Sequence, residues 1–297
     1  MKQLAVLFLG LLISACNSDA KRPAKIGYVS YASGSADVYL MNADGSNIEQ
    51  ITNTDDNNSF PFQIDKETIG FSRFDKDRNQ TLHQINIYTK EEQPYEETPL
   101  VDGAKWQEES PDGHYVAFVR SSDYRDRDLY IYNTKTKSEK LILSHKDSTA
   151  MAYSINHSWS SDSKKLVFMS GVDWYNQVIR YYDVDNDSIV TVTDRGYMNS
   201  GLLWTGDDKT LVANLKVRDE TLYELYSVNS ESGVVTRLTD SINLHPNIAS
   251  DGKTLVFESQ RHGDGDIYTM KADGTELRRI TTDSIYEGRA FWFEMDE

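Results

Sequence analysis

The segment A-S-D-G-K-T-L-V-F at residues 249–257, followed by D-I-Y-T-M-K-A-D-G at 266–274, decides the fold of this 297-residue chain. Its first part is a polar turn that leads into an apolar strand. Its second part is a strand that ends in another polar turn. Short strands separated by Asp-Gly turns are typical of antiparallel hairpins. The segment therefore predicts consecutive β-hairpins.

Both parts recur along the chain. The turn-and-strand part returns as S-P-D-G-H-Y-V-A-F, S-S-D-S-K-K-L-V-F and T-G-D-D-K-T-L-V-A, and in degenerate form as Q-I-D-K-E-T-I-G-F. The second part places equivalent residues 42 to 50 positions apart, at Asn42, Thr89, Asn133, Asp183, Asn229 and Lys271. A repeat of this length with four strands per unit is typical of β-propeller blades.

The two ends of the chain complete one repeat. Lys25-Ile26-Gly27-Tyr28 matches a second strand without its first, and Arg289 to Asp296 matches a first strand. We therefore expect an all-β fold over residues 25–297, a six-bladed β-propeller with four-stranded antiparallel blades. The C-terminal strand should join the N-terminal blade and close the ring, leaving no open edge. Gln107-Glu108-Glu109 is an insertion in the third copy and predicts a bulge or a loosened strand there.

The N-terminus has the layout of an export signal. Residues 1–15 combine Lys2 with a short apolar run, too short to span a bilayer, and they precede the single cysteine, Cys16. Ile13-Ser14-Ala15-Cys16 resembles a bacterial lipobox, in which the cysteine is acylated; the alternative is an ordinary signal peptide cleaved nearby. Residues 16–24 then form the lipidated cysteine and a polar tether. Asn17 after the cysteine favours the outer membrane, with the domain facing the periplasm.

Charge and cysteine content exclude several function classes. The net charge is −16, which opposes binding to nucleic acid and to anionic lipid headgroups, so Cys16 would be the only membrane attachment. One cysteine allows no internal disulfide, so the fold depends on its core and its sheet hydrogen bonds.

The repeats resemble a known family. W-S-S-D-S-K-K-L-V-F at 159–168 and the continuous stretch at 250–281 look like the WD-like propeller repeats of TolB, and the resemblance extends over residues 25–296. It implies the six-bladed fold but no particular function, because similar propellers bind partners, gate peptidases or carry lyase sites. The chain departs from TolB in two ways: it has no room for the preceding α/β domain, and it carries a lipobox. TolB's own role is therefore not transferred.

No catalytic or metal motif stands out. The chain has no G-x-S-x-G element, so hydrolase chemistry is not expected. Asp183-Val184-Asp185-Asn186-Asp187 resembles a calcium loop, but Ser188 replaces the required glycine and the segment coincides with a hairpin turn. His83 and His114 are expected at the surface, and the other four histidines in loops that share one face. We expect no metal and no cofactor.

The long connections should gather on one face of the propeller, which we call the loop face. Tyr, Trp and Arg are enriched at binding hot spots, and loops carry binding residues more often than strands. Each arginine has a plainer alternative role, an ion pair with a neighbouring aspartate. The ligand-face candidates are Tyr124, Arg125, Arg127, Trp174, Tyr175, Arg195, Tyr197, Arg261, Tyr286 and Arg289.

The sequence thus favours a non-enzymatic, envelope-anchored module that binds a protein or peptide. Two alternatives stay open. One is a carbohydrate-active protein, a glycan binder or polysaccharide lyase that uses the loop face. The other is a structural envelope protein that spaces its neighbours.

Overall fold

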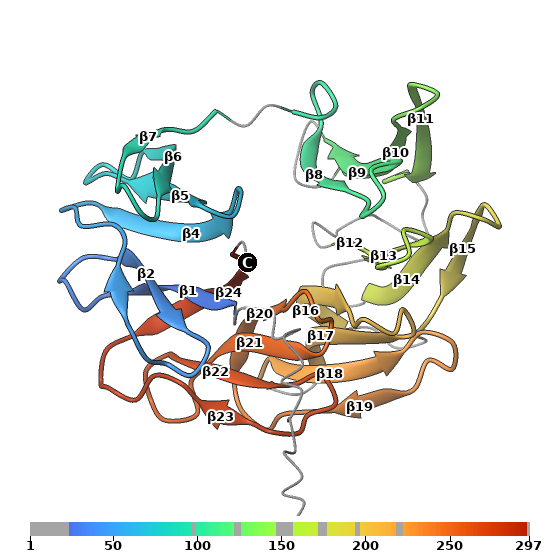
Figure 1. Cartoon of the computed structure of the whole chain (residues 1–297). Helices are drawn as coiled ribbons and strands as arrows, with labels where there is room; N and C mark the ends of the chain where they lie inside the picture. The colour runs from blue at the N-terminus through green and yellow to red at the C-terminus, as the bar shows by residue number, and fades with distance from the viewer. Residues whose placement is uncertain are drawn as a thin grey trace, which may run out of the picture.

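The computed structural model describes residues 24–96, 99–121, 126–146, 157–171, 177–193, 197–217 and 222–295, without the side chains of 197–200 and 217. Figure 1 shows these segments as a ring of blades around a central axis. The described residues contain strands and no helix, and they form six four-stranded antiparallel blades, as the sequence predicts.

In each blade the first strand lies nearest the axis and the fourth at the periphery (Figure 1). Blades 1 to 3 consist of β24 (Glu287–Phe293), β1 (Lys25–Ser30), β2 (Asp37–Asn42) and β3 (Glu49–Gln50); β4 (Asn57–Gln63), β5 (Thr68–Phe74), β6 (Gln80–Asn86) and β7 (Glu92–Pro94); β8 (Lys105–Glu109), β9 (Tyr115–Arg120), β10 (Asp128–Asn133) and β11 (Ser138–Leu143). Blades 4 to 6 consist of β12 (Ser158–Trp159), β13 (Lys165–Gly171), β14 (Gln177–Asp183) and β15 (Ser188–Thr191); β16 (Tyr197–Trp204), β17 (Thr210–Val217), β18 (Glu224–Asn229) and β19 (Val235–Arg237); β20 (Asn243–Ile248), β21 (Thr254–Ser259), β22 (Asp266–Lys271) and β23 (Arg278–Arg279).

The recurring aspartate explains the turn between first and second strands. The Asp251 carboxylate accepts the backbone N–H of Lys253 at 2.7 Å and of Thr254 at 3.0 Å. Such bonds from an aspartate to the backbone two and three residues later fix the turn. Gly252 has a φ of 63°, in the left-handed region that glycine adopts without strain. The Ser-Asp-Gly signature is therefore a requirement of the turn and not of a ligand.

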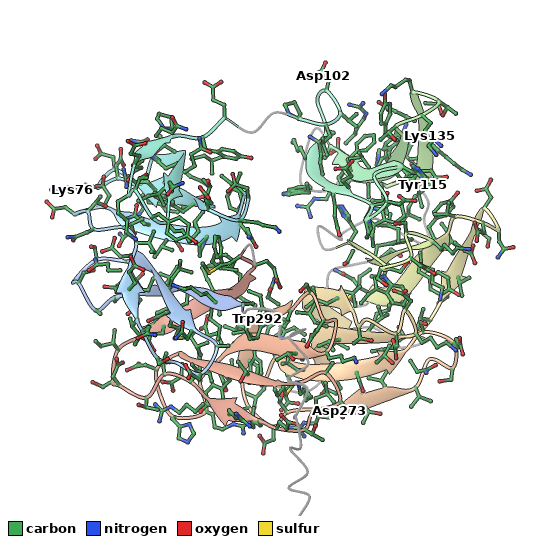
Figure 2. All side chains as sticks on the ribbon, in the orientation of Figure 1. Lys76, Asp102, Tyr115, Lys135, Asp273 and Trp292 are labelled. Atoms are coloured by element: carbon green, nitrogen blue, oxygen red, sulfur yellow. The ribbon has the colours of Figure 1, made fainter. Side chains whose placement is uncertain are left out.

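Ring closure also follows the prediction. β24 pairs antiparallel with β1, so that Lys25 lies opposite Phe293 and Gly27 opposite Phe291. Figure 2 shows Trp292 of this strand near the centre of the ring, whereas Lys76 and Lys135 lie at its periphery. The two ends of the described chain thus share blade 1.

Five of the six junctions between blades contain a shared apolar core. The clusters centre on Phe168 between blades 3 and 4, Leu211 between 4 and 5, Phe257 between 5 and 6, Ile26 between 6 and 1, and Phe71 between 1 and 2. At three of these junctions a tryptophan of the first strand also reaches the preceding blade. The indole N–H groups of Trp159, Trp204 and Trp292 each donate to a backbone carbonyl of that blade at 3.1 Å.

The junction between blades 2 and 3 differs. Among the described residues no buried cluster combines side chains of these two blades, and Val116 and Phe118 pack with Val101 from the preceding connection instead. Glu109 occupies the position in blade 3 that Trp159 occupies in blade 4. Each lies opposite the second residue of the second strand of its blade, which is β9 in blade 3 and β13 in blade 4. The ring is therefore stabilised least at this junction.

Phe62 and Phe291 show the consequence for packing. Each ring covers a glycine of the neighbouring strand, and a Cβ at Gly70 or Gly27 would come within 2.4 Å of it. Phe291 is 7% exposed because blade 2 covers it, whereas Phe62 is 36% exposed. The same side chain in the same local setting is buried at one junction and open at the other.

Within the described residues, five of the six first strands are bulged. The predicted bulge in the third copy is confirmed as a register shift between Lys105 and Glu108. The insertion is not its cause, because β4, β16, β20 and β24 shift register at corresponding places. Phe60, Trp106, His245 and Arg289 occupy these bulges with φ of 51–52°. A bulge re-aims the side chain that it carries.

Two expectations about the histidines are wrong. His245 lies at the bulge of β20 and not in a loop. His83 lies within β6, where its ring stacks on buried Phe71 at 5.7 Å between centroids, and its Nδ1 lies 2.9 Å from a Glu92 carboxylate oxygen. His114 is a turn residue with a half-exposed side chain, as expected. Asp183 to Ser188 form the hairpin between β14 and β15, as expected from Ser188 in place of glycine.

Candidate functional site

A pocket opens on the loop face where blades 6, 1 and 2 meet. Its volume is about 430 Å³, within the usual range for small-ligand sites. Antiparallel blades place the second-to-third-strand loops and the connections between blades at the same end, so distant segments converge there. The lining residues are Val29, Tyr31, Ser59, Tyr286 and Arg289.

Bulge residues of three blades hold Arg289 in place. Its guanidinium lies over the Phe60 ring, 3.8 Å from the centroid, and an Nη lies 3.4 Å from Nε2 of His245. Stacking on an aromatic face orients a guanidinium without neutralising it. Phe60 belongs to blade 2, Arg289 to blade 1 and His245 to blade 6, so the bulges bring the three together.

A buried carboxylate lies beneath the pocket. Glu258 is 1% exposed, and one of its oxygens lies 3.3 Å from Nδ1 of His245. Tyr286 also hydrogen-bonds Glu258, and burial together with that carboxylate raises the pKa of the Tyr286 hydroxyl. A Cβ at Gly288 would lie 2.3 Å from the Glu258 carboxylate, so a side chain at this position in β24 would displace that carboxylate. Tyr286 is thereby kept protonated as a hydrogen-bond donor.

Glu287 is a second buried carboxyl group near the site. It is 3% exposed, and burial, its largest influence, raises its pKa to about 7 despite a hydrogen bond with Thr281. Its Oε2 has no hydrogen-bond partner among the described residues. Keeping this group uncharged therefore favours the fold.

Stability should depend on pH through Glu287. In the folded protein the Glu287 pKa of about 7 exceeds the ordinary 4.5. The neutral carboxyl group therefore makes its full contribution to the free energy of unfolding below pH 4.5, and this contribution is lost as the pH rises to about 7. Glu287→Gln cannot ionise, so at high pH it should retain on the order of 2–3 kcal/mol of unfolding free energy that the parent loses. Thermal melting of both proteins at pH 5 and pH 8 measures it, with the variant gaining most at pH 8. An identical pH dependence in the two proteins would contradict the assignment.

The structure brings together two of the predicted ligand-face residues, Tyr286 and Arg289. Arg261 instead pairs with Asp240 at 2.8 Å, which is its plainer alternative role. Arg127 is 9% exposed and lies over the Trp106 ring at 5.0 Å, so it contributes to packing. The other candidates lie outside the described residues or, for Tyr197, outside the described side chains: Cys16, Tyr124, Arg125, Trp174, Tyr175, Arg195 and Tyr197.

Sequence reasoning missed several members of the site. Tyr31 and Ser59 line the pocket, and Phe60 and Glu258 support it. Phe60, His245 and Arg289 occupy corresponding positions in their repeats, and a comparison of first strands alone would have revealed this. Their mutual contact depends on the closure of the ring.

Across the described segments no group of three or more His, Cys, Asp and Glu side chains is placed to hold a metal ion. Within the same segments no helix is long and apolar enough to cross a bilayer.

The architecture and the site together define a closed six-bladed propeller with a ligand-sized pocket on its loop face. Residues 158–295 match the family model described as the TolB beta propeller domain. An uncharacterized protein of Agrobacterium fabrum is 36% identical over 85 residues, which are 28% of each chain.

Two solved structures share the fold. TolB from Acinetobacter baumannii superposes with a TM-score of 0.62 at 18% identity, over 91% of this chain and 66% of that one. A putative TolB from Agrobacterium tumefaciens gives a TM-score of 0.58 at 16% identity, over 88% of this chain and 90% of its own. This chain thus spans just under two thirds of the first structure and less than a third of the curated relative. The protein is a TolB-like six-bladed β-propeller.

Proposed function

We propose that this protein is a non-enzymatic binding module of the bacterial cell envelope that captures a protein or peptide on its loop face. The observation that carries the proposal is the pocket at the junction of blades 6, 1 and 2. Aromatic rings, hydroxyl groups and one arginine line it, which are the side-chain types of binding hot spots. Those residues alone offer no activated nucleophile with a base beside it.

The packing of the site supports recognition by a preformed surface. Tyr31 and Tyr286 contact each other edge to face with ring centroids 5.8 Å apart, and Arg289 is fixed over Phe60. Side chains held in this way lose little conformational freedom when a ligand binds. Tyr31 is nevertheless 47% exposed, so it can contact a partner.

The envelope location rests on the N-terminal sequence and on the likeness to TolB. Acylation of Cys16 would anchor the propeller to a membrane, and Asn17 favours the periplasmic side of the outer membrane. The tether to residue 24 spans at most roughly 25–28 Å when extended. The propeller would therefore meet partners that lie close to the membrane surface.

Affinity capture from gently crosslinked, detergent-solubilised envelopes tests the proposal. The full-length protein should sediment with membranes and retain a stoichiometric protein partner, and Cys16→Ser should release it from the membrane. Arg289→Glu should reduce capture at least tenfold because it places a negative charge inside the pocket.

Lys135→Glu is the matched control for that experiment. It makes the same change of charge at an exposed tight turn on the opposite face, between β10 and β11, and should leave capture unchanged. Equal capture by both variants would exclude the loop-face pocket as the binding surface.

A further inference from the structure

Arg289 is a cation without an anionic partner. Five other arginines form ion pairs with carboxylates within 4.0 Å, and among the described residues Arg289 forms none. Its polar contact is the ring nitrogen of His245 at 3.4 Å. In a chain of net charge −16, a guanidinium that lines a pocket and lacks a carboxylate partner is available to an anion from outside.

The surrounding charges limit that anion to a single negative charge. Glu258 lies below the pocket in contact with His245 and Tyr286. One guanidinium with a buried carboxyl group this close balances a single negative charge better than a phosphate dianion. A carboxylate matches the charge of the guanidinium and its two-pronged geometry.

The rest of the pocket fits a carboxylate attached to an apolar group. Tyr31 and Ser59 bring hydroxyl groups to the lining, and the edge-to-face Tyr31–Tyr286 pair forms an aromatic wall. Val29 adds an apolar contact. Aromatic walls bury hydrocarbon, while the hydroxyl groups and the arginine orient the polar end of a ligand.

We propose that Arg289 recognises a carboxylate of the peptide ligand, from its C-terminus or from an acidic side chain. This inference rests on the proposed peptide-binding function and specifies what the pocket selects. Capture of a free carboxylate by backbone and side-chain donors is an established mode of peptide recognition.

The test is NMR of the full-length protein in detergent, with labelled arginine side chains and the Arg289 signal assigned by its loss in Arg289→Lys. N-acetylphenylalanine carries a terminal carboxylate and N-acetylglutamate N-methylamide a side-chain carboxylate. At least one should shift the Arg289 signal saturably. The corresponding amides, N-acetylphenylalaninamide and N-acetylglutamine N-methylamide, should bind at least about tenfold more weakly. Arg261→Lys is the control, because Arg261 is already paired with Asp240, and it should leave the titration unchanged.

The outcomes separate this inference from the proposed function. Equal shifts with acid and amide, or tighter binding of inorganic phosphate, would overturn carboxylate recognition. Tighter binding of galacturonate, which is itself a carboxylate, would overturn a peptide as the source of that carboxylate. If Arg289→Glu abolishes partner capture while no carboxylate moves the Arg289 signal, the inference fails and the loop-face binding function stands. A saturable shift of the Arg289 signal that requires the carboxylate supports the inference.

Discussion

Deletion of residues 287–297 is expected to abolish the cooperatively folded protein. This deletion removes β24, the first strand of blade 1, and exposes the edge of β1. It also takes Phe291 and Phe293 from the core between blades 1 and 2, and Trp292 from the core between blades 6 and 1. Three such side chains contribute roughly 5–9 kcal/mol, which is comparable to the stability of a whole domain.

Circular dichroism and thermal melting of the purified protein measure this effect. Deletion of residues 296–297 is the control, because it leaves β24 intact and should melt like the parent. A truncated protein that lacks β24 and still unfolds cooperatively within a few degrees of the parent would show that ring closure is not required for folding.

The second large effect is a difference between two equivalent phenylalanines. Phe291→Ala should destabilise the protein by about 3–4 kcal/mol, since it opens a cavity in a buried junction. Phe62→Ala should cost about 1 kcal/mol or less, because its ring is partly in water already. Both rings cover a glycine of the adjacent strand, so each variant is the control for the other.

Urea unfolding monitored by fluorescence gives the two free energies of unfolding. Losses of equal size would mean that blade 3 covers the Phe62 face in solution as completely as blade 2 covers Phe291. A small loss at both positions would mean that the buried cluster between blades 1 and 2 contributes little to stability.

The repeats predicted the blades because local chemistry determines them. The aspartate of each turn bonds the backbone within three residues, and Trp159, Trp204 and Trp292 mark first strands that reach the preceding blade. The residues that form these contacts lie within a few positions of one another or about one repeat apart in the sequence. They therefore leave a periodic signature in the sequence.

The open junction and the pocket were not predictable in the same way. Phe62 and Leu82 have the residue types of buried counterparts, and only the arrangement of the neighbouring blade leaves them partly exposed. A local sign in the third repeat was Glu109, which occupies the position that Trp159 occupies in the fourth. Arg289 meets Phe60 from the other end of the chain, so their contact depends on a bulge register and a closed ring.

In-cell photocrosslinking shows whether a partner binds at the loop face. A photoreactive phenylalanine derivative replaces Tyr31 at the pocket or Ile48 at the opposite face of the same blade; these residues are 47% and 58% exposed. We expect a discrete higher-mass adduct from position 31 and none from position 48. An adduct at position 48 alone, or equal adducts at both, would contradict it.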